Sequence, residues 1–457
     1  MSNRRSFLQS ALALGAGGYI LPRTPRPRNT AARSAGRAAQ PAVAYPDGRK
    51  LAWKLDNGVK VFHLVAEPVR QELIPGKTLD LWGYNGSAPG PMIEINEGDR
   101  VRILFENHLP EPTAIHWHGL DVPNDMDGMP GITQPYILPG QRFIYEFTLH
   151  QNGTYFYHSH MAMQEMLGMI GPFIIHPRAG YQPPVDQDFA IVLQEYAALP
   201  NNPVPNTMSM EFNWLTMNGK SAPATTPLVM RLGQRVRVRL INLGMDGHPI
   251  HLHGMQFWIT GTEGGRQPVS NWIHRNTVWV AVAQAYDIEF EANNPGEWML
   301  HCHLPHHMMN QMASTVGPMT RGYGMPAGIN MPASMGMPDE GPALSADYGA
   351  GLGRGMGISS RYMAPEGNGP MRMHGMPGMR LRQAIAPHAG QVPGFPQDAF
   401  MENPAMNMDK AVAKPETYGL PPGWSGFMGG MMTLVRVLDE TMYDKIQALI
   451  AAEGRQA

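Results

Sequence analysis

Four pairs of histidines, each pair separated by one residue, are the side chains of this sequence best suited to metal chemistry. The pairs are His116/His118, His158/His160, His251/His253 and His301/His303. Residues two apart on a β-strand lie on the same face, so each pair presents two imidazoles to one place. One such pair is most simply explained as polar residues on a partly exposed strand. Four pairs together predict a site that binds several metal ions through imidazole nitrogens.

The only cysteine of the chain, Cys302, lies between His301 and His303. On a strand its side chain points away from the face of the two histidines, so it needs a site of its own. A thiolate with two imidazoles and a weak thioether forms a blue-copper electron-transfer centre. The candidate partners nearby are His248, His307 and Met312. A lone cysteine is otherwise a small buried apolar residue, but the flanking histidines favour the copper site.

An internal repeat brings the histidine pairs into register. Residues 98–107 match residues 233–242, and residues 139–160 match residues 282–303. These two alignments superimpose the first two histidine pairs on the last two. The chain therefore contains two copies of one domain, with equivalent histidines in each.

The two copies, residues 45–180 and 187–318, are predicted to be all-β. Short β-branched and aromatic runs alternate with Gly, Pro and Asn, and no long run has the 3.6-residue period of a helix. The runs are Val101–Phe105, Phe143–Phe147, Phe173–His176, Val236–Ile241, Phe257–Ile259 and Val278–Phe290. Two tandem Greek-key β-sandwich domains are the expected architecture.

Residues 1–44 resemble a twin-arginine export signal followed by a linker. Arg4 and Arg5 precede a weakly apolar run over residues 10–21. This run is shorter than the ~20 residues that a membrane-spanning helix needs. We therefore expect a periplasmic or secreted protein without a membrane span.

A stretch rich in methionine, glycine and proline, residues 319–428, interrupts the second copy. Between residues 313 and 432 lie 17 of the 36 methionines of the chain. Such a composition buries little core and predicts a mobile insertion, followed over residues 429–457 by a closing strand and a short terminal helix. Thioethers select Cu(I), so the insertion is predicted to capture cuprous ions. The plainer alternative is a low-complexity loop that tolerates methionine.

The histidine motifs resemble the four copper motifs of multicopper oxidases such as laccases, ascorbate oxidase and bacterial copper-resistance oxidases. The similarity covers residues 45–318 and implies two cupredoxin-like domains. Its motifs are His116-Trp-His-Gly119, Tyr157-His-Ser-His160, His248-Pro-Ile-His-Leu-His-Gly254 and His301-Cys-His-Leu-Pro-His-His307 with Met312.

This resemblance implies four coppers per chain. The type 1 copper would be bound by His248, Cys302, His307 and the axial Met312, with Met431 or Met432 as rival axial ligands. The type 2 copper would be bound by His116 and His251. The type 3 pair would be bound by His118, His158, His160, His253, His301 and His303.

Proton delivery is less clearly encoded. Asp127 resembles the acid that relays protons to oxygen in the family, although an aspartate before glycine is also common in turns. Some relatives carry a second relay acid directly after the type 1 histidine, where this chain has Met308. His306 is expected to be a solvent or edge histidine.

The repeat also restricts the architecture. The first copy has Thr113, Ser159 and Gln164 where the second has the type 1 ligands, so it is not expected to bind a blue copper. This argues against a copper nitrite reductase, which carries its blue copper in the first domain.

Only residues 181–186 separate the copies, so the middle domain of most laccases is missing. The resemblance is then to two-domain laccases, which implies a homotrimer with each cluster shared between neighbouring subunits.

Composition and motifs together limit the function. The net charge is −2 and charged residues are 16% of the chain, so there is no basic field to recruit nucleic acid. The predicted reaction uses O2 and a small reductant, either Cu(I) for copper tolerance or phenols and aromatic amines. The alternative is a non-catalytic periplasmic protein that binds or stores copper.

Overall fold

The computed structural model describes residues 40–161, 163–198, 202–208, 210, 212–308 and 408–454. Met312, most of the predicted export signal and most of the methionine-rich insertion lie outside these ranges. The last residues before the predicted first domain are described, and Ala44 pairs with Phe189. Within the described part of the chain, no helix has the length and apolar character needed to cross a membrane.

The first domain is a sandwich of two β-sheets. One sheet has the order β1-β2-β5-β7, with β3 on β2, and the other has the order β4-β9-β8-β6. The strands are β1 (Trp53–Asp56), β2 (Val59–Ile74), β3 (Lys77–Tyr84), β4 (Ile93–Asn96), β5 (Arg100–Asn107), β6 (Ile115–His118), β7 (Arg142–Thr148), β8 (Gly153–Ser159) and β9 (Ile170–His176). Burial alternates along β5, so Val101, Ile103 and Phe105 pack between the sheets.

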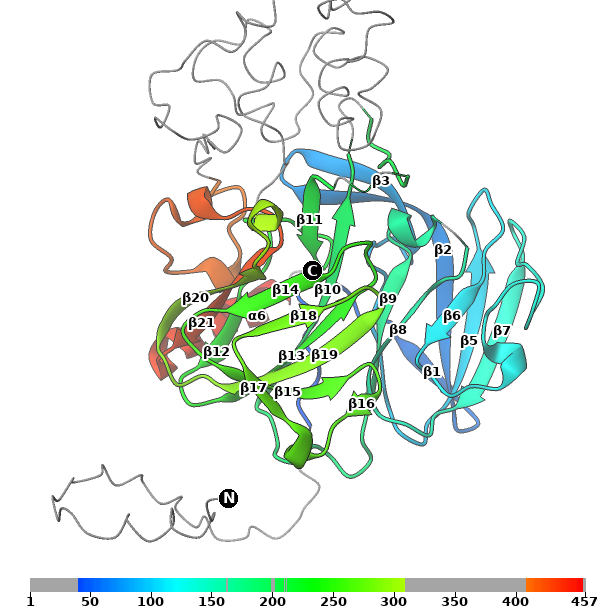
Figure 1. Cartoon of the computed structure of the whole chain (residues 1–457), viewed down its shortest axis with the longest axis horizontal. Coiled ribbons are helices and arrows are strands. Elements are labelled where there is room, and N and C mark those ends of the chain that lie inside the picture. The colour runs from blue at the N-terminus through cyan, green and yellow to red at the C-terminus, as the bar shows by residue number, and fades with distance from the viewer. Residues whose placement is uncertain are drawn as a thin grey trace, which may run out of the picture. The chain divides into compact units, whose positions relative to one another are not determined.

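The second domain repeats this plan with longer sheets (Figure 1). One sheet has the order β11-β10-β13-β19-β15-β16, with β17 on β15, and the other has the order β12-β21-β20-β14-β18. The strands are β10 (Gln187–Tyr196), β11 (Trp214–Met217), β12 (Leu228–Arg231), β13 (Arg235–Asn242), β14 (His248–Leu252), β15 (Phe257–Thr262), β16 (Gly265–Arg266), β17 (Ile273–Arg275), β18 (Thr277–Val280), β19 (Gln284–Glu291), β20 (Gly296–Cys302) and β21 (Met432–Leu438). The all-β prediction is confirmed.

One predicted strand is two strands in the structure. The run Val278–Phe290 contributes to β18 and β19, which belong to different sheets. The chain turns between them at residues 281–283, where Ala283 has a φ of 61°. An apolar run alone does not reveal such a turn, because alanine is an unusual residue for a positive φ.

The closing strand of the second domain comes from beyond the methionine-rich stretch. β21 runs parallel to β12 and antiparallel to β20, as β9 runs parallel to β4 and antiparallel to β8. In the first domain, residues 160–169 connect the equivalent strands. In the second domain, the connection runs from His303 to Met431, so the long insertion lies within this domain.

The end of the predicted insertion is part of the folded domain. Residues 408–428 contain the 3-10 helices η6 (Pro415–Thr417) and η7 (Trp424–Phe427), and Val412 is buried among Tyr196, Ala198 and Trp214. The terminal helix α6 (Glu440–Glu453) begins at Asp439, whose side chain accepts the backbone N–H of Met442. Ile446 of this helix packs on Leu438.

The two domains share an interface with an apolar part and a charged part. Phe156 and Ile174 of the first domain pack against Val192 and Ile241 of the second. In the charged part, β13 presents Arg235, Arg237 and Arg239 on one face, and all three lie against carboxylates of β10 and β19. Tyr181 of the connecting segment packs on Arg237, and Thr154 of the first domain contacts Arg239.

Glu289 is the centre of the charged part. It is fully buried and lies 2.8 Å from Arg235, 2.8 Å from Arg237 and 2.5 Å from Arg266. Arg239 extends the network across the interface by donating to Thr154 of β8 at 2.6 Å. Burial raises the pKa of Glu289, but Arg237 and Arg266 outweigh this effect and bring the pKa to about 2.

We predict that Glu289→Gln destabilises the protein by about 3–5 kcal/mol at neutral pH, because it removes the carboxylate that pairs with the largely buried Arg235 and Arg266. The depressed pKa adds stability that is present above about pH 4.5 and is lost as the pH falls towards 2. The difference in free energy of unfolding between wild type and variant should therefore decrease by roughly 1.4 kcal/mol per pH unit below pH 4.5. Denaturant unfolding between pH 7 and pH 3 measures both effects, and a gap of constant size would contradict the assignment.

Candidate metal centres

Strand pairing places the donors of the second domain on the two faces of one sheet. β14 pairs with β20 so that His251 lies opposite His301, and Ile250 lies opposite Cys302. Because side chains alternate along a strand, the two histidines share the outer face. Cys302 and Ile250 point inwards, into the hydrophobic core. Adjacent residues of β20 therefore belong to two different sites.

Three potential ligand atoms converge on the inner side of β20. Cys302 Sγ lies 3.4 Å from His307 Nδ1 and 3.8 Å from His248 Nδ1, and the two nitrogens are 3.2 Å apart. All three residues are buried, and their ligand atoms lie close enough together to hold one metal ion. One sulfur and two imidazole nitrogens are the donor set of a blue-copper site, so these residues fit copper.

Burial controls the protonation of these donors. It raises the pKa of the Cys302 thiol to about 12, and the negative charges of Glu195 and Asp246 add to this effect. Burial lowers the pKa of His307 to about 3, with a further contribution from His248. The imidazole is therefore neutral, which is its ligating form, and the thiol loses its proton when a cation replaces it.

The first domain has a hydrogen-bonded polar cluster at the equivalent position. Gln164 Oε1 accepts from Ser159 Oγ at 2.6 Å and from Thr113 Oγ1 at 2.9 Å. The two hydroxyl oxygens are 3.2 Å apart, and all three side chains are buried. These groups satisfy one another. They include neither a thiolate nor an imidazole for a blue copper.

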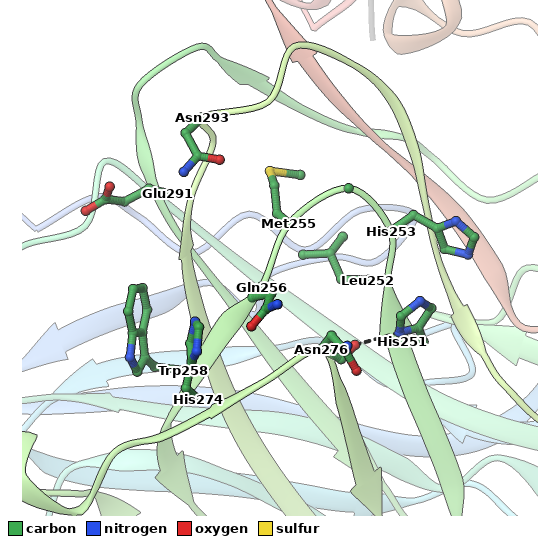
Figure 2. Close-up of a pocket in the computed structure, with 11 residues that line it drawn as sticks. His251, Leu252, His253, Met255, Gln256, Trp258, His274, Asn276, Glu291 and Asn293 are labelled. Carbon is green, nitrogen blue, oxygen red and sulfur yellow. Dashed lines mark hydrogen bonds between the residues drawn. The ribbon is translucent and has the colours of Figure 1, made fainter. Parts of the chain in front are cut away.

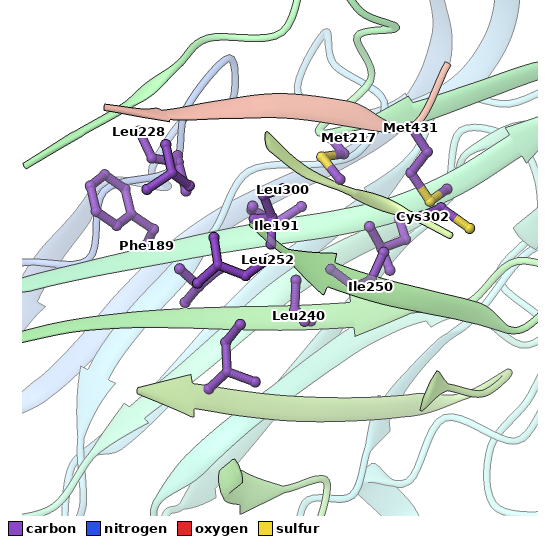
Figure 3. Close-up of a cluster of buried hydrophobic side chains, with 14 of the residues drawn as sticks. Phe189, Ile191, Met217, Leu228, Leu240, Ile250, Leu252, Leu300, Cys302 and Met431 are labelled. Atoms are coloured by element: carbon purple, nitrogen blue, oxygen red, sulfur yellow. The ribbon is translucent and has the colours of Figure 1, made fainter. Parts of the chain in front are cut away.

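Met431 lies beside the sulfur and nitrogen donors. It is fully buried, and Figure 3 shows it next to Cys302 in the core cluster. Its backbone N–H donates to His307 O at 2.9 Å, and its carbonyl accepts from Cys302 N at 3.0 Å. Met432, the next residue, lies opposite His301 in the sheet register. Of these two methionines, Met431 is therefore the one on the side of the thiol.

Met169 is the counterpart of Met431 in the first domain. Its N–H donates to Gln164 O at 3.3 Å, and its carbonyl accepts from Ser159 N at 3.2 Å. Gln164 and Ser159 correspond to His307 and Cys302 in the repeat. The two buried methionines thus occupy equivalent positions, directly before the strand that closes each domain.

A cluster of four histidines lies on the outer face in each domain. The ring centroids of His116, His118, His158 and His160 are 5.4–6.0 Å from their neighbours in the cluster. Those of His251, His253, His301 and His303 are 4.9–5.8 Å apart. Burial and neighbouring imidazoles lower the pKa of His118 to about 4, so this imidazole is neutral at neutral pH.

Backbone carbonyls fix the orientation of four of these rings. In each case the ring Nδ1 lies at hydrogen-bond distance from a carbonyl oxygen, which leaves Nε2 as the ligating atom. The pairs are His116 with Asp127 (2.8 Å), His158 with Ser159 (2.8 Å), His251 with Asn276 (2.7 Å) and His301 with Cys302 (2.8 Å). In the second cluster, His253 Nε2 and His301 Nε2 lie 2.9 Å apart. Such convergence of ring nitrogens suits metal binding.

The two histidine clusters remain separate within the chain. Among the described residues, the histidine ring contacts join members of one cluster and none joins the two clusters. His160 and His303 are exposed. An open pocket of about 580 Å³ lies beside His251 and His253 (Figure 2). Each cluster is therefore accessible to a further group of ligands.

Three further residues were predicted at or near the metal sites. Asp127 Oδ1 is 3.4 Å from His116 Nδ1, next to the first cluster. His306 is exposed, and its ring centroid is 4.6 Å from that of His307. Met312 lies outside the described residues.

Two carboxylates that the sequence did not single out also contact candidate ligands. Glu195 Oε2 lies 3.1 Å from His248 Nε2, and Glu165 Oε1 lies 3.1 Å from His158 Nδ1. Glu165 directly follows Gln164, which matches the candidate ligand His307 in the repeat. This sequence position could have drawn attention to Glu165. Glu195 is 53 residues from His248 and belongs to no local motif.

Comparison with known proteins identifies relatives of both domains. Two family models, each described as multicopper oxidase, match residues 68–180 and 198–318. The blue copper oxidase from Nitrosomonas europaea is 32% identical, with a TM-score of 0.51, over 55% of this chain and 81% of that protein.

The curated relatives are longer than the matched region. Copper resistance protein A of Pseudomonas syringae pv. tomato is 32% identical over 43% of this chain and 29% of the relative. Multicopper oxidase MmcO of Mycobacterium tuberculosis is 27% identical over 63% of this chain and 60% of the relative. The match thus covers less than two thirds of the length of either relative.

Proposed function

Because the chain belongs to the multicopper oxidase family, we propose that it couples one-electron oxidation of a small substrate to reduction of dioxygen to water. The observation that carries the proposal is the arrangement along β20. Cys302 contributes to a buried sulfur and nitrogen site, and its neighbours His301 and His303 contribute to a histidine cluster on the other side of the strand. A storage protein has no need for two different sites joined through adjacent residues.

In this proposal His248, Cys302 and His307 bind the type 1 copper. Met431, in place of Met312, would be the thioether ligand of this copper. The support for Met431 is its burial, its two backbone hydrogen bonds to ligand residues and its equivalence to Met169.

The histidine clusters would bind the other three coppers. His116 and His251 are proposed for the type 2 copper, and the remaining six histidines for the type 3 pair. When bound, these ions would store electrons received from the type 1 copper and deliver them to dioxygen. The chain's own contribution is to orient the ring nitrogens through backbone carbonyls. Asp127, beside His116, is proposed to hold a proton for the reduction of oxygen.

We predict that Cys302→Ser abolishes both the intense visible absorption of the copper-loaded protein and its oxygen uptake, because the thiolate provides the absorption and the entry point for electrons. The histidine clusters should still bind copper, as measured by metal analysis. Ser159→Ala, at the equivalent position of the first domain, is the matched control and should retain colour and turnover. Blue colour in Cys302→Ser would exclude the proposed electron entry site.

The separation of the clusters supports a head-to-tail trimer in which the first domain of one subunit meets the second domain of the next. Exposed apolar side chains flank the second cluster on its own face. Trp279 is 54% exposed and lies two residues from Thr277, whose hydroxyl is 2.9 Å from His251. Met299 is 36% exposed and lies two residues from His301. Exposed apolar groups around an incomplete site are typical of an interface.

Assembly is tested by placing a charge on this face. Met299→Glu should dissociate the trimer and abolish oxygen uptake, because a buried unpaired carboxylate is costly at an interface. The blue absorption should persist, since all type 1 ligands come from one subunit. Native mass spectrometry and oxygen uptake measure these effects, with Met208→Glu, at a 79% exposed methionine, as the control. A wild-type protein that is monomeric and fully active would exclude the trimer.

Cu(I) is the proposed preferred substrate, with a role in copper tolerance. The methionine-rich insertion lies in the sequence between His307 and Met431, two of the proposed type 1 ligands. Thioethers bind Cu(I) readily, so the insertion would concentrate cuprous ions where electrons enter. Similarity to a copper resistance protein supports this choice. Oxidation of phenols is the second candidate, supported by 46% identity over 104 residues to a laccase of Cryptococcus neoformans.

Replacing the methionines between residues 319 and 401 with leucine should lower the rate with Cu(I) relative to a phenol by about tenfold or more, which corresponds to ~1.4 kcal/mol of lost binding. Leucine preserves the length and apolar character of the segment and removes only the sulfur. Oxygen uptake with each reductant provides the ratio. An unchanged ratio would show that the insertion does not select the substrate.

The proposed location is the periplasm or the cell exterior. The support is the resemblance of residues 1–44 to a twin-arginine export signal. Exchange of Arg4 and Arg5 for lysine should retain the protein in the cytoplasm, where cell fractionation would detect it.

A further inference from the structure

Glu195 is a buried carboxylate that contacts the imidazole of His248 on the side away from Cys302. Its Oε2 atom lies 3.1 Å from His248 Nε2, and neither side chain is exposed. The other ring nitrogen, Nδ1, faces Cys302 Sγ at 3.8 Å and His307 Nδ1 at 3.2 Å. If Nδ1 is the ligating atom, Nε2 carries the proton and donates it to Glu195.

The carboxylate also organises the loop that leads into His248. Its Oε1 atom accepts the backbone N–H groups of Met245 and Asp246, the latter at 3.0 Å. Gly244 leaves the space for it, since a Cβ there would lie 2.1 Å from Oε2. The two backbone groups are donors, and His248 Nε2 is a third donor when Nδ1 is the ligating nitrogen.

No lysine or arginine of the described residues forms an ion pair with Glu195. His248 is the partner in its ion pair, and the negative charge of Asp246 repels it. A buried charge without a partner is costly. A metal ion on the opposite nitrogen of His248 would supply the missing positive charge through the ring.

We propose that Glu195 is a positioning residue for the type 1 copper, which fixes the Nε2–H form of His248 and favours the oxidised metal. This inference rests on the proposed type 1 site. The carboxylate directs the Nδ1 lone pair at the metal, and its negative charge is separated from the metal by one imidazole. Because the oxidised ion carries one more positive charge than the reduced ion, the carboxylate stabilises it more and lowers the reduction potential.

Asp246 provides a matched comparison within the same site. Its Oδ2 atom is 3.7 Å from Nε2 of His307, beyond hydrogen-bond distance, and its side chain is 36% exposed. Solvent screens this charge more than that of Glu195. Removing each carboxylate in turn therefore distinguishes the effect of a buried, hydrogen-bonded charge on the reduction potential from the effect of a partly exposed charge.

The experiment compares the copper-loaded proteins Glu195→Gln and Asp246→Asn with the wild type. Glu195→Gln should raise the midpoint potential of the blue site more than Asp246→Asn does, and it should lose type 1 copper faster to a chelator. The faster loss of copper has a simple cause. In the variant, the glutamine oxygen accepts the backbone N–H groups of Met245 and Asp246, so its N–H₂ group faces His248 Nε2–H. Two donors then face each other, and the position of His248 is no longer fixed. Potential shifts of equal size, or no shift in Glu195→Gln, would overturn the proposal.

Two further measurements keep the outcome interpretable. If Glu195→Gln does not take up copper, Gly244→Ala is used, whose Cβ displaces the carboxylate and should shift the potential in the same direction. The absence of a blue band in the wild type would instead refute the type 1 site itself. An unchanged potential in Gly244→Ala would reject the role of Glu195 alone.

Discussion

The alternation of side chains along a β-strand is the constraint on which the rest of this structure depends. His301, Cys302 and His303 are consecutive residues, but β20 directs the cysteine into the core and the histidines to the outer face. A strand is the simplest element that can separate two sets of ligands while keeping them covalently adjacent. The sandwich then supplies His248 from β14 to the inner site, and the same strand supplies His251 to the outer one. In the proposed reaction, this short segment would connect the two metal sites covalently.

The first domain shows what the same framework does without a thiol. Thr113, Ser159 and Gln164 satisfy one another by hydrogen bonds, and Met169 keeps the backbone contacts that Met431 makes in the second domain. The β-sandwich can therefore be well packed at this position without a metal, because buried polar side chains of suitable size occupy it. Electron entry is accordingly assigned to one domain, whereas both domains retain a histidine cluster on the outer face.

Much of this could be predicted from the sequence, because repeated motifs and alternating patterns are local. The fold class, the repeat and the closeness of His248, Cys302 and His307 followed from such patterns. Three features could not be settled in this way. The sequence named Met431 only as one of three candidate methionines, because a long insertion separates it from His307. Glu195 reaches His248 through tertiary packing. The arginines of β13 alternate as in a solvent-exposed strand, but Tyr181 and Thr154 pack against them, and they form a buried network around Glu289.

In the proposed trimer, two half-sites from different subunits form one oxygen-reducing centre. His118→Ala disables the first half-site and His253→Ala disables the second, so neither variant alone should consume oxygen. Coexpression of the two variant chains would create mixed trimers. At some junctions the intact first domain of a His253→Ala chain would meet the intact second domain of a His118→Ala chain. With random pairing, about one quarter of the junctions should be intact and oxygen uptake should recover to about that fraction of the wild type. Mixed assemblies that form but remain inactive would show that the oxygen-reducing centre is not shared between subunits.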